Sequence, residues 1–343
     1  MRNTSILYTA VTSFSSKSSK IFTDIYTILK DSFSFMNNRT RKKIDKLQPA
    51  PQTTVNNASQ SSKWIIVGES VIGKSHISGN LPCQDENFFK TFKKNWGIAI
   101  VCDGAGSAEK SDKGAEFCAI EALPRYFEDL VNREQWIEKE ELPLPEEWQQ
   151  KATDEFKKAL GALSFVANEN HIELTTLACT VIVVIFSPLG LLVAHIGDGR
   201  AGYCDRENGW QSMMIPHKGE EANQTIFLTS NSWYKDSKLK MSGVNVPECR
   251  VIKTVPSAFV LMSDGCEQHS FECSLIDANT GSWSDPNKPY NKFFDPLVST
   301  LKNMATSPIT VDIQESWSSF LKNGTEGLRN ESDDKTMILG ILQ

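Results

Sequence analysis

Four short apolar segments meet an aspartate at one end, and this pattern constrains the fold more than any other feature of the sequence. Three of them run into Asp103, Asp198 and Asp264, and each of these aspartates is followed by a glycine. The fourth, Thr336–Leu342, begins just after Asp333-Asp334. A strand buried in a sheet holds its end rigidly, and a glycine beside it lets backbone or ligand approach closely. The pattern therefore predicts carboxylates fixed at strand ends.

Carboxylates that converge in this way repel one another unless a cation lies among them. Their hard oxygen atoms are the ligands that Mg²⁺ or Mn²⁺ prefers. Asp-Gly is also a common turn dipeptide, so any one of these segments alone indicates only a turn. Four in one chain, each beside an apolar strand, favour a shared site that binds divalent cations.

The order of the remaining elements predicts the fold class. Strands and helices do not alternate regularly; helices occur in two blocks with strand hairpins between them. This order predicts an α+β fold with largely antiparallel sheets. The predicted strands are 64–67, 96–102, 177–186, 191–196, 202–204, 210–215, 251–254, 258–262 and 336–342, and the predicted helices are 112–133 with a kink at Pro124, 146–170, 296–304 and 310–322.

Composition divides the 343 residues into two parts. Residues 1–60 are rich in Ser, Thr, Asn and Lys and end in a Pro-, Gln- and Ser-rich stretch, which is typical of a flexible tail and linker. Residues 61–343 have the apolar patterning of one folded domain. We therefore expect a tail over 1–60 and a single domain over 61–343.

Charge and cysteine usage exclude several classes of protein. The net charge of −6 gives no basic excess of the kind that nucleic-acid surfaces show. No apolar run approaches the roughly 18 residues of a membrane span, and no signal peptide is evident. The eight cysteines include no Cys-x-x-Cys pair, and several lie in apolar runs. Buried reduced thiols in a cytoplasmic protein are the expectation.

Nine short motifs follow one another over about residues 64–343. They are Gly-Lys-Ser-His (73–76), Pro-Cys-Gln-Asp (82–85), Asp-Gly-Ala-Gly-Ser (103–107), Ser-Asp-Lys-Gly-Ala (111–115), Thr-Leu-Ala-Cys-Thr (176–180), His-Ile-Gly-Asp-Gly-Arg (195–200), Gly-Glu-Glu-Ala-Asn-Gln-Thr (219–225), Ser-Asp-Gly (263–265) and Asp-Asp-Lys-Thr (333–336). No one motif is specific alone, but their common order and their position on strands are. With these motifs the chain resembles the metal-dependent protein phosphatases of the protein phosphatase 2C type, and among them the bacterial type-2 branch.

The resemblance implies an αββα sandwich, in which two antiparallel sheets lie face to face with helices outside. It implies metals at one end of the sandwich. Asp103 would bridge two ions, with the Gly104 carbonyl on one of them, and Asp264 and Asp333 would complete the other. Asp333 is preferred over Asp334 because the family's aspartate stands three residues before a Thr or Ser, here Thr336.

Two further aspartates follow from the same resemblance. Asp85 would lie just outside the metal pair and orient a metal-bound water, and is counted with Asp103 as catalytic. Asp198, with Asp264, matches a weaker third-metal position. The implied cofactors are two Mg²⁺ or Mn²⁺ ions, with a third at that weaker position. The implied reaction is attack of a metal-bridging hydroxide on phosphoserine or phosphothreonine in a protein, by a monomer that opposes a protein kinase.

Three positions depart from the family's pattern. Ala105 stands where better-known members have a histidine acid, so another group must protonate the leaving oxygen. Asn80 stands where a phosphate-gripping arginine is usual, and Gln84 where a glutamate is. We expect His76 or Arg200, or else Lys74, to replace the arginine.

Two alternatives stay open at this point. Residues 68–75 match the P-loop pattern G-x₄-G-K-[ST] after an apolar strand. A P-loop needs a helix directly after Lys74-Ser75, yet Gly79 and Pro82 fall inside that helix, and no parallel βαβ unit follows. The second alternative is a degenerate phosphatase fold that serves as a regulatory binding module; the retained aspartates argue against it, and the missing arginine and histidine argue for it.

Overall fold

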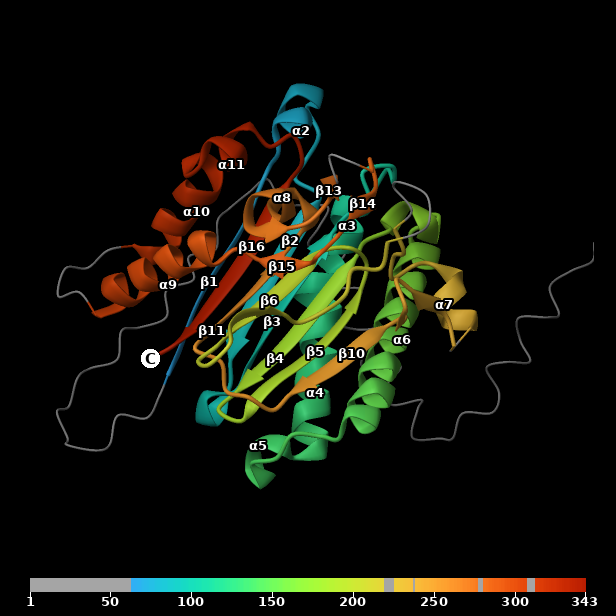
Figure 1. The fold of residues 1–343 in the computed structure, drawn as a ribbon. Helices are drawn as coiled ribbons and strands as arrows, with labels where there is room; N and C mark the ends of the chain where they lie inside the picture. The colour runs from blue at the N-terminus through green and yellow to red at the C-terminus, as the bar shows by residue number, and fades with distance from the viewer. Residues whose placement is uncertain (1–62, 219–224, 237, 277–279, 307–311) are drawn as a thin grey trace, which may run out of the picture. The chain divides into compact units, whose positions relative to one another are not determined.

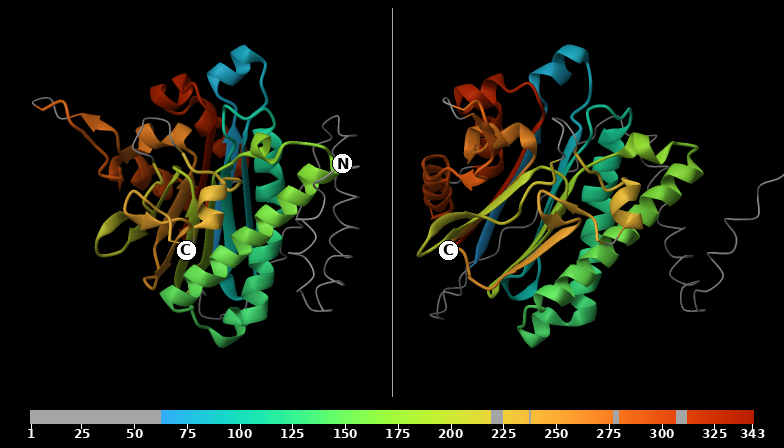
Figure 2. Two further views of the ribbon diagram at one scale, coloured as in Figure 1. Left: turned by 90° about the vertical axis from the view of Figure 1, so that its right-hand side faces the viewer. Right: turned by 45° about the vertical axis from the view of Figure 1, so that its right-hand side comes forward.

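Two antiparallel sheets packed face to face form the centre of the folded part. The computed structural model describes residues 63–218, 225–236, 238–276, 280–306 and 312–343. Helices cover the outer face of each sheet (Figures 1 and 2). The predicted αββα sandwich is confirmed. The predicted tail lies outside the described residues.

The first sheet contains five strands in the order β1-β16-β11-β6-β7. Its central strand β11 is apolar along its whole length and fully buried, as a strand covered on both faces must be. All neighbouring pairs are antiparallel. The strands are β1 (Trp64–Val71), β16 (Lys335–Leu342), β11 (Ala258–Met262), β6 (Arg200–Asp205) and β7 (Gly209–Ser212).

The second sheet also contains five strands, in the order β10-β5-β4-β3-β2. The predicted hairpin around Ser-Pro-Leu-Gly is confirmed: β4 and β5 pair antiparallel from Val181↔Ile196 to Ser187↔Gly190. The strands are β10 (Glu248–Ile252), β5 (Gly190–Ile196), β4 (Val181–Ser187), β3 (Gly97–Asp103) and β2 (Asp85–Thr91).

Helices on the second sheet agree closely with the sequence prediction. The 25-residue α6 (Pro145–Glu169) starts at its N-terminal proline and packs on β5 and β10. The helix predicted over 112–133 is divided into α3 (Ser111–Glu116), a π-helical turn η2 (Phe117–Ala122) and α4 (Leu123–Glu134). Pro124 lies in the first turn of α4, where its missing N–H costs nothing, so it begins a helix rather than kinking one.

The first sheet is covered by α9 (Asn291–Thr306) and α10 (Ile313–Asn323), both predicted. Trp317 of α10 donates from its indole N–H to the Met337 carbonyl at 3.1 Å. The smaller elements are α2 (Lys74–Gly79), α5 (Trp136–Lys139), α7 (Asn231–Lys235), α8 (Glu267–Ser270), α11 (Glu326–Asn330), η1 (Lys93–Asn95), η3 (Leu174–Leu177), η4 (Asp264–Cys266), β8 (Lys240–Met241), β9 (Val244–Asn245), β12 (Phe271–Glu272), β13 (Leu275–Ile276), β14 (Trp283–Ser284) and β15 (Lys288–Pro289).

Aromatic side chains fill the space between the sheets. Trp64 of β1 packs edge-on against Phe259 of β11 with ring centroids 5.2 Å apart, and Phe186 of β4 stacks on Phe259 at 5.3 Å. All three side chains are buried. Burial of such a side chain stabilises the fold by about 1.5–3 kcal/mol, so this contact fixes how the two sheets face each other.

Two further observations concern the state of the cysteines and the length of the apolar helices. All eight cysteines are free thiols, as expected, and those at 102, 118, 179, 266 and 273 are buried. Within the described residues, no helix is long and apolar enough to span a bilayer.

Candidate active site

The strand ends from both sheets meet at one end of the sandwich. Asp103 ends β3 and lies directly opposite Asp85, the first residue of β2. On the other sheet, β11 ends just before Asp264, and β16 starts just after Asp333. A Cβ at Gly265 would stand 2.0 Å from the Asp334 carbonyl oxygen, so only glycine lets these two segments lie side by side.

Asp85 joins the two sheets at this end. Its Oδ2 accepts a hydrogen bond from the Ser263 hydroxyl at 2.6 Å and lies 2.8 Å from the Thr336 hydroxyl. Ser263 and Thr336 flank the ends of β11 and β16, which belong to the opposite sheet. No hydrogen bond within the described residues uses the other oxygen, Oδ1. The carboxylate is therefore anchored through one oxygen with the second one available.

Asp103 and Asp264 lie in a field of neighbouring carboxylates. Burial raises the pKa of Asp103 well above its usual value, and Asp85, Asp264, Asp198 and Asp333 add to the shift. Burial also raises the pKa of Asp264 to about 7, with Asp198 and Asp333 contributing. Both shifts report the free energy cost of holding like charges together away from water.

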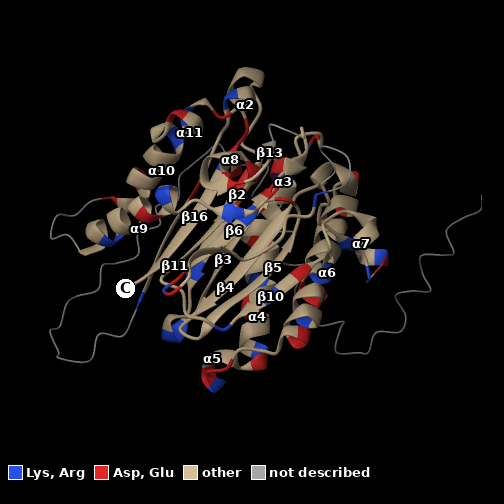
Figure 3. Cartoon of the chain, viewed as in Figure 1, with Lys and Arg blue, Asp and Glu red and all other residues tan. Residues whose placement is uncertain are grey.

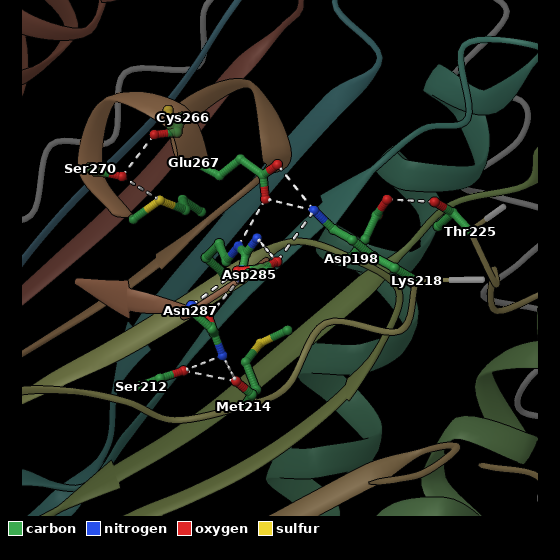
Figure 4. Close-up of polar contacts among 12 residues, drawn as sticks. Asp198, Ser212, Met214, Lys218, Thr225, Cys266, Glu267, Ser270, Asp285 and Asn287 are labelled. Atoms are coloured by element: carbon green, nitrogen blue, oxygen red, sulfur yellow. Dashed lines mark hydrogen bonds and ion pairs between the residues drawn. The ribbon is translucent and has the colours of Figure 1, made fainter. Parts of the chain in front are cut away.

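Asp198 approaches the same centre from the turn between β5 and β6. Its Oδ2 accepts a hydrogen bond from the Thr225 hydroxyl (Figure 4). Burial raises its pKa, while this hydrogen bond and the charge of Lys218 oppose the shift. The structure thus brings together five of the aspartates that the sequence singled out. We call Asp85, Asp103, Asp198, Asp264 and Asp333 the strand-end cluster.

Asp333 and Asp334 are adjacent in sequence but differ in their surroundings. Asp334 is buried, and it accepts hydrogen bonds from the backbone N–H groups of Gly73 at 2.7 Å and Gln84 at 2.6 Å. It also contacts His76 Nδ1 at 2.8 Å. Asp333 is exposed and acts on the charges of Asp103 and Asp264. Both carboxylate oxygens of Asp334 are thus occupied by groups of the chain.

The donor set of the strand-end cluster fits a divalent cation. Burial is the largest influence on the carboxylates of Asp85, Asp103, Asp198 and Asp264. Neighbouring carboxylates come next for Asp103 and Asp264, whereas hydrogen bonds from Ser263 and Thr225 come next for Asp85 and Asp198. Lys218, acting on Asp198, is the cation among these influences. Figure 3 shows acidic residues gathered at this end of the sheets, between α8, β2 and α3. Among the described residues, the buried amide oxygen Oε1 of Gln84 has no hydrogen-bond partner. Oxygen donors with uncompensated negative charge are what Mg²⁺ or Mn²⁺ binds.

The cluster is not a closed coordination sphere. In the described part of the chain, no group of three or more His, Cys, Asp or Glu side chains already surrounds one point at ligand distance.

The three side chains expected to replace the phosphate-gripping arginine all have partners within the chain. The Arg200 side chain is fully buried and donates to Glu267, Asp285 and Asn287. His76 pairs with Asp334. Lys74 donates to Asn330 at 2.8 Å. The guanidinium of Arg200 is thus fully engaged with carboxyl and amide groups of the chain.

Sequence reasoning missed a second acidic group, which the structure places beside the first. Glu267 of α8 accepts from Arg200 Nε at 2.8 Å and lies 3.2 Å from Lys218 Nζ. Asp285 receives two hydrogen bonds from the same guanidinium, at 3.1 and 2.6 Å. Figure 4 shows the Lys218 amine between the two carboxyl groups. We call Arg200, Lys218, Glu267 and Asp285 the paired cluster.

A signal for the paired cluster was present but not specific. Glu267 follows Asp264 by three residues, the spacing that places side chains on one face of a helical turn. Lys218 immediately precedes the Gly-Glu-Glu motif at 219–221. The partner Asp285, however, lies in a segment whose approach to β6 only tertiary structure reveals.

A pair of buried histidines supports the turn that carries Asp198. His195 and His217 stack with ring centroids 4.2 Å apart. His217 Nδ1 accepts from the Gly197 N–H at 3.2 Å, and its Nε2 donates to the Asn245 carbonyl at 2.9 Å. Both side chains are fully buried.

The P-loop match at 68–75 does not form a phosphate cradle. A short helix, α2, does follow it, but the N–H groups of Lys74 and Ser75 donate to the carbonyls of Glu331 and Ser332. The Gly73 N–H donates to Asp334. The preceding strand β1 pairs antiparallel with β16, so no parallel unit is present there. The backbone donors that would hold phosphates are already used.

Several known proteins are similar to this chain. The serine/threonine-protein phosphatase 3 of Escherichia coli (strain K12) is 26% identical over 282 residues, which cover 81% of this chain and 98% of that protein. The solved catalytic domain of the serine threonine protein phosphatase PstP, in complex with 2 manganese ions, is 14% identical with a TM-score of 0.48, covering 82% of this chain and 99% of that one. Serine/threonine phosphatase Stp1 from Staphylococcus aureus is 14% identical with a TM-score of 0.47, covering 86% and 100%.

The family follows from a match to the sequence itself. The model of the family described as protein phosphatase 2C matches residues 72–314. That range is more than half of the chain and includes Asp85, Asp103, Asp198 and Asp264, while Asp333 lies beyond it. The chain therefore belongs to the protein phosphatase 2C family.

Proposed function

We propose that this chain is a metal-dependent serine/threonine protein phosphatase that hydrolyses phosphate monoesters in phosphorylated proteins. The observation that carries the proposal is the strand-end cluster: carboxylates from both sheets, buried or half-buried except for Asp333, converge with little cationic compensation. Membership of the protein phosphatase 2C family gives that arrangement its chemistry. The E. coli relative, a serine/threonine-protein phosphatase, supports the same substrate class.

Each residue of the strand-end cluster has a proposed role. Asp103, with the carbonyl of Gly104, would hold two ions, and Asp264 and Asp333 would complete the second. Asp198 would serve a weaker third position. When bound, divalent ions lower the pKa of coordinated water and neutralise phosphate oxygens. The solved PstP domain in complex with 2 manganese ions favours Mn²⁺ as the first metal to test, with Mg²⁺ beside it.

Asp85 would act on water rather than on the metals. Its Oδ2 is anchored by Ser263, and the residue lies opposite Asp103 in the β2–β3 pair, which leaves Oδ1 to accept from a water. A fixed acceptor orients an attacking water for in-line displacement. Ala105 carries no acid, so the leaving oxygen must take its proton from another source. No Ser or Cys nucleophile is required in this scheme.

Lys218 replaces His76 and Arg200 as the proposed phosphate-binding side chain. Its side chain is 37% exposed, whereas that of Arg200 is 0% exposed. Its charge already acts on Asp198. A flexible amine at the margin of the site binds a phosphate oxygen as a point charge.

The deciding experiment is hydrolysis of a phosphothreonine peptide with and without Mn²⁺, by the wild type and by Asp103→Asn. We expect Mn²⁺-dependent turnover in the wild type and a loss of about 10³-fold or more in the variant, since removal of a bridging charge weakens both ions. Asp129→Asn, on the exposed face of α4, is the matched control and should retain full activity.

The outcome also separates this function from a regulatory binding module. No turnover by the wild type with either metal, or turnover that Asp103→Asn leaves intact, would overturn the proposal. A monomeric state, an opposing protein kinase and a cytoplasmic location stay predictions. Gel filtration with light scattering would test the first of these.

A further inference from the structure

An open pocket lies next to the strand-end cluster, on the side of Ala105. Its volume is about 480 Å³, and three segments form its walls: the loop after Gly104, the η3 segment, and the segment 227–231. Ala105 follows Asp103 by two residues, so the pocket begins within roughly 7 Å of the cluster along the chain. The lining residues are Ala105, Ser107, Ala108, Glu109, Thr175, Thr176, Ala178, Phe227, Thr229, Ser230 and Asn231.

Hydrogen bonds hold the pocket's walls in place. On one side, the Ala105 N–H donates to the Ala178 carbonyl at 2.9 Å, and the Lys110 N–H donates to the Thr176 carbonyl at 3.0 Å. These bonds pin the loop on both sides of Glu109. On the other side, the Leu228 N–H donates to the Cys179 carbonyl at 2.9 Å. The pocket is therefore a built feature of the fold and not a gap between loose loops.

The chemistry of the lining selects one class of occupant. Six of the lining side chains carry hydroxyl or amide groups, which can exchange hydrogen bonds with a peptide backbone. Alanine side chains and Phe227 supply apolar surface, and Glu109 is the one charged residue of the lining. In the described part of the chain its side chain is exposed and forms no ion pair or hydrogen bond. A free carboxylate in an open pocket favours a cationic side chain and disfavours an anionic one.

We propose that this pocket is a substrate-selecting subsite, which receives a lysine or arginine side chain close in sequence to the phosphorylated residue. The inference rests on the proposed phosphatase function and names its substrate class. An extended peptide advances about 3.3 Å per residue. A phosphoresidue at the strand-end cluster therefore places residues roughly one to three positions away over the pocket. The volume is ample for an arginine side chain.

The test uses phosphothreonine peptides in which each flanking position in turn carries Arg, Ala or Glu. We measure kcat/KM with Mn²⁺ for the wild type, for Glu109→Gln and for Glu109→Lys. In the wild type, Arg at one flanking position should give kcat/KM about three- to tenfold above Ala, the size of a partly exposed ion pair, with Glu below Ala. Glu109→Gln should remove the preference, and Glu109→Lys should reverse it.

Several controls separate this inference from the proposal that the chain is a phosphatase. Glu141→Gln, an exposed residue after α5, removes the same charge far along the chain and should keep the preference. Hydrolysis of p-nitrophenyl phosphate, which has no flanking residues, should be equal in all variants. Raised ionic strength should reduce the Arg preference, since exposed pairs are screened.

Binding of non-hydrolysable phosphonate versions of the same peptides keeps the test independent of turnover. A Glu109-dependent preference in binding without any hydrolysis of p-nitrophenyl phosphate would sustain the subsite and overturn the phosphatase proposal. Equal binding and equal kcat/KM of Arg, Ala and Glu peptides by the wild type would overturn the subsite. A preference that survives in Glu109→Gln would overturn it as well.

Discussion

The strand-end cluster and the paired cluster lie beside each other, and both contain carboxyl groups that range from buried (Asp85, Glu267) to exposed (Asp333, Asp285). They differ in how their charge is balanced. In the strand-end cluster, burial and like charges raise the pKa values of Asp103, Asp85 and Asp264. In the paired cluster, burial would raise the pKa of Asp285, but hydrogen bonds and charge from Arg200 bring it below its usual value.

The comparison separates a structural charge cluster from one that functions with a bound ion. The paired cluster carries its own cations, so its ion pairs are complete without any ligand. The strand-end cluster is complete only with a cation from solution. Asp264 and Glu267 both carry a carboxyl group and are only a few residues apart. They nevertheless take opposite roles, because different cations balance their charges.

Removal of Arg200 should have the largest effect on stability. It leaves the carboxylates of the paired cluster unbalanced by a cation, as those of the strand-end cluster are. Arg200→Ala leaves Glu267 and Asp285 without their main cation, and we expect unfolding free energy to fall by about 3–5 kcal/mol. Urea unfolding followed by tryptophan fluorescence measures it. Arg206→Ala, at an exposed position, is the control and should change stability by no more than about 0.5 kcal/mol.

A small effect of Arg200→Ala would contradict the comparison. It would mean that water or Lys218 balances the two carboxylates as well as the guanidinium does. The stability of Arg200→Ala in the presence of Mn²⁺ is a further test. Stabilisation beyond that of the wild type would show that the emptied cluster has itself become a cation site.

His217 tests whether burial alone is enough to suppress a charge in this region. Burial lowers the pKa of His217 to about 4, and its hydrogen bond to the Asn245 carbonyl opposes the shift. The folded pKa lies below the unfolded value of 6.5. The unfolded state therefore binds more protons in this window, and the stability present above pH 6.5 is lost as pH falls toward 4.

We expect the loss from His217 to approach about 3 kcal/mol over that window. His217→Gln, which keeps a donor for the Asn245 carbonyl, should show a flatter dependence of unfolding free energy on pH from 6.5 to 4. His171→Gln, at an exposed position, should follow the wild type. Parallel profiles for the wild type and His217→Gln would show that the imidazole is not buried neutral in solution.

Divalent cations should stabilise the protein through the strand-end cluster. At a free Mn²⁺ concentration of about 100 times the dissociation constant, unfolding free energy should rise by about 2.7 kcal/mol. Asp264→Asn should reduce this gain and should also stabilise the metal-free protein, since one of the repelling charges is gone. Thermal unfolding with Mn²⁺ or with a chelator measures both effects.

The control for this prediction is Asp129→Asn, which should keep the full response to Mn²⁺. A variant at Asp264 that responds as the wild type does would remove that residue from the proposed ligand set. Stabilisation of Asp264→Asn without metal distinguishes loss of repulsion from simple damage to the fold, which would act in the other direction.

The sequence predicted the parts of the fold and of the site that depend on local patterns. Apolar runs that end at Asp103 and Asp264 indicated strands with fixed carboxylates, and the hairpin of β4 and β5 followed from its turn residues. The α6 helix followed from Pro145 and helical periodicity. These signals are local, and burial of the patterned faces reinforced them.

The parts that could not be predicted depend on contacts between distant segments. The charge of Arg200 is the same whether its guanidinium binds a phosphate or Asp285. Only the approach of the segment before β15 decides between these two partners. His217 is polar and lies between turn residues, yet its ring stacks on His195. Sequence patterns do not encode which polar group a buried cation meets.

Lys218 should give the smallest effect, and it joins the two clusters. Its amine lies 3.2 Å from Glu267 Oε1 and 3.9 Å from Asp285 Oδ2, while its charge acts on Asp198. Lys218→Met removes the charge and keeps the length of the side chain. If Lys218 serves the phosphate, KM for a phosphopeptide should rise about three- to tenfold, with kcat nearly unchanged.

If Lys218 instead only balances the paired cluster, the variant should lose about 1 kcal/mol of stability or less and keep its KM. Lys235→Met, at an exposed position in α7, controls for loss of a surface charge. The KM effect should shrink as ionic strength rises, because a partly exposed amine is screened by salt. An unchanged KM at low salt would place Lys218 wholly in the paired cluster and leave the phosphate to the metal ions.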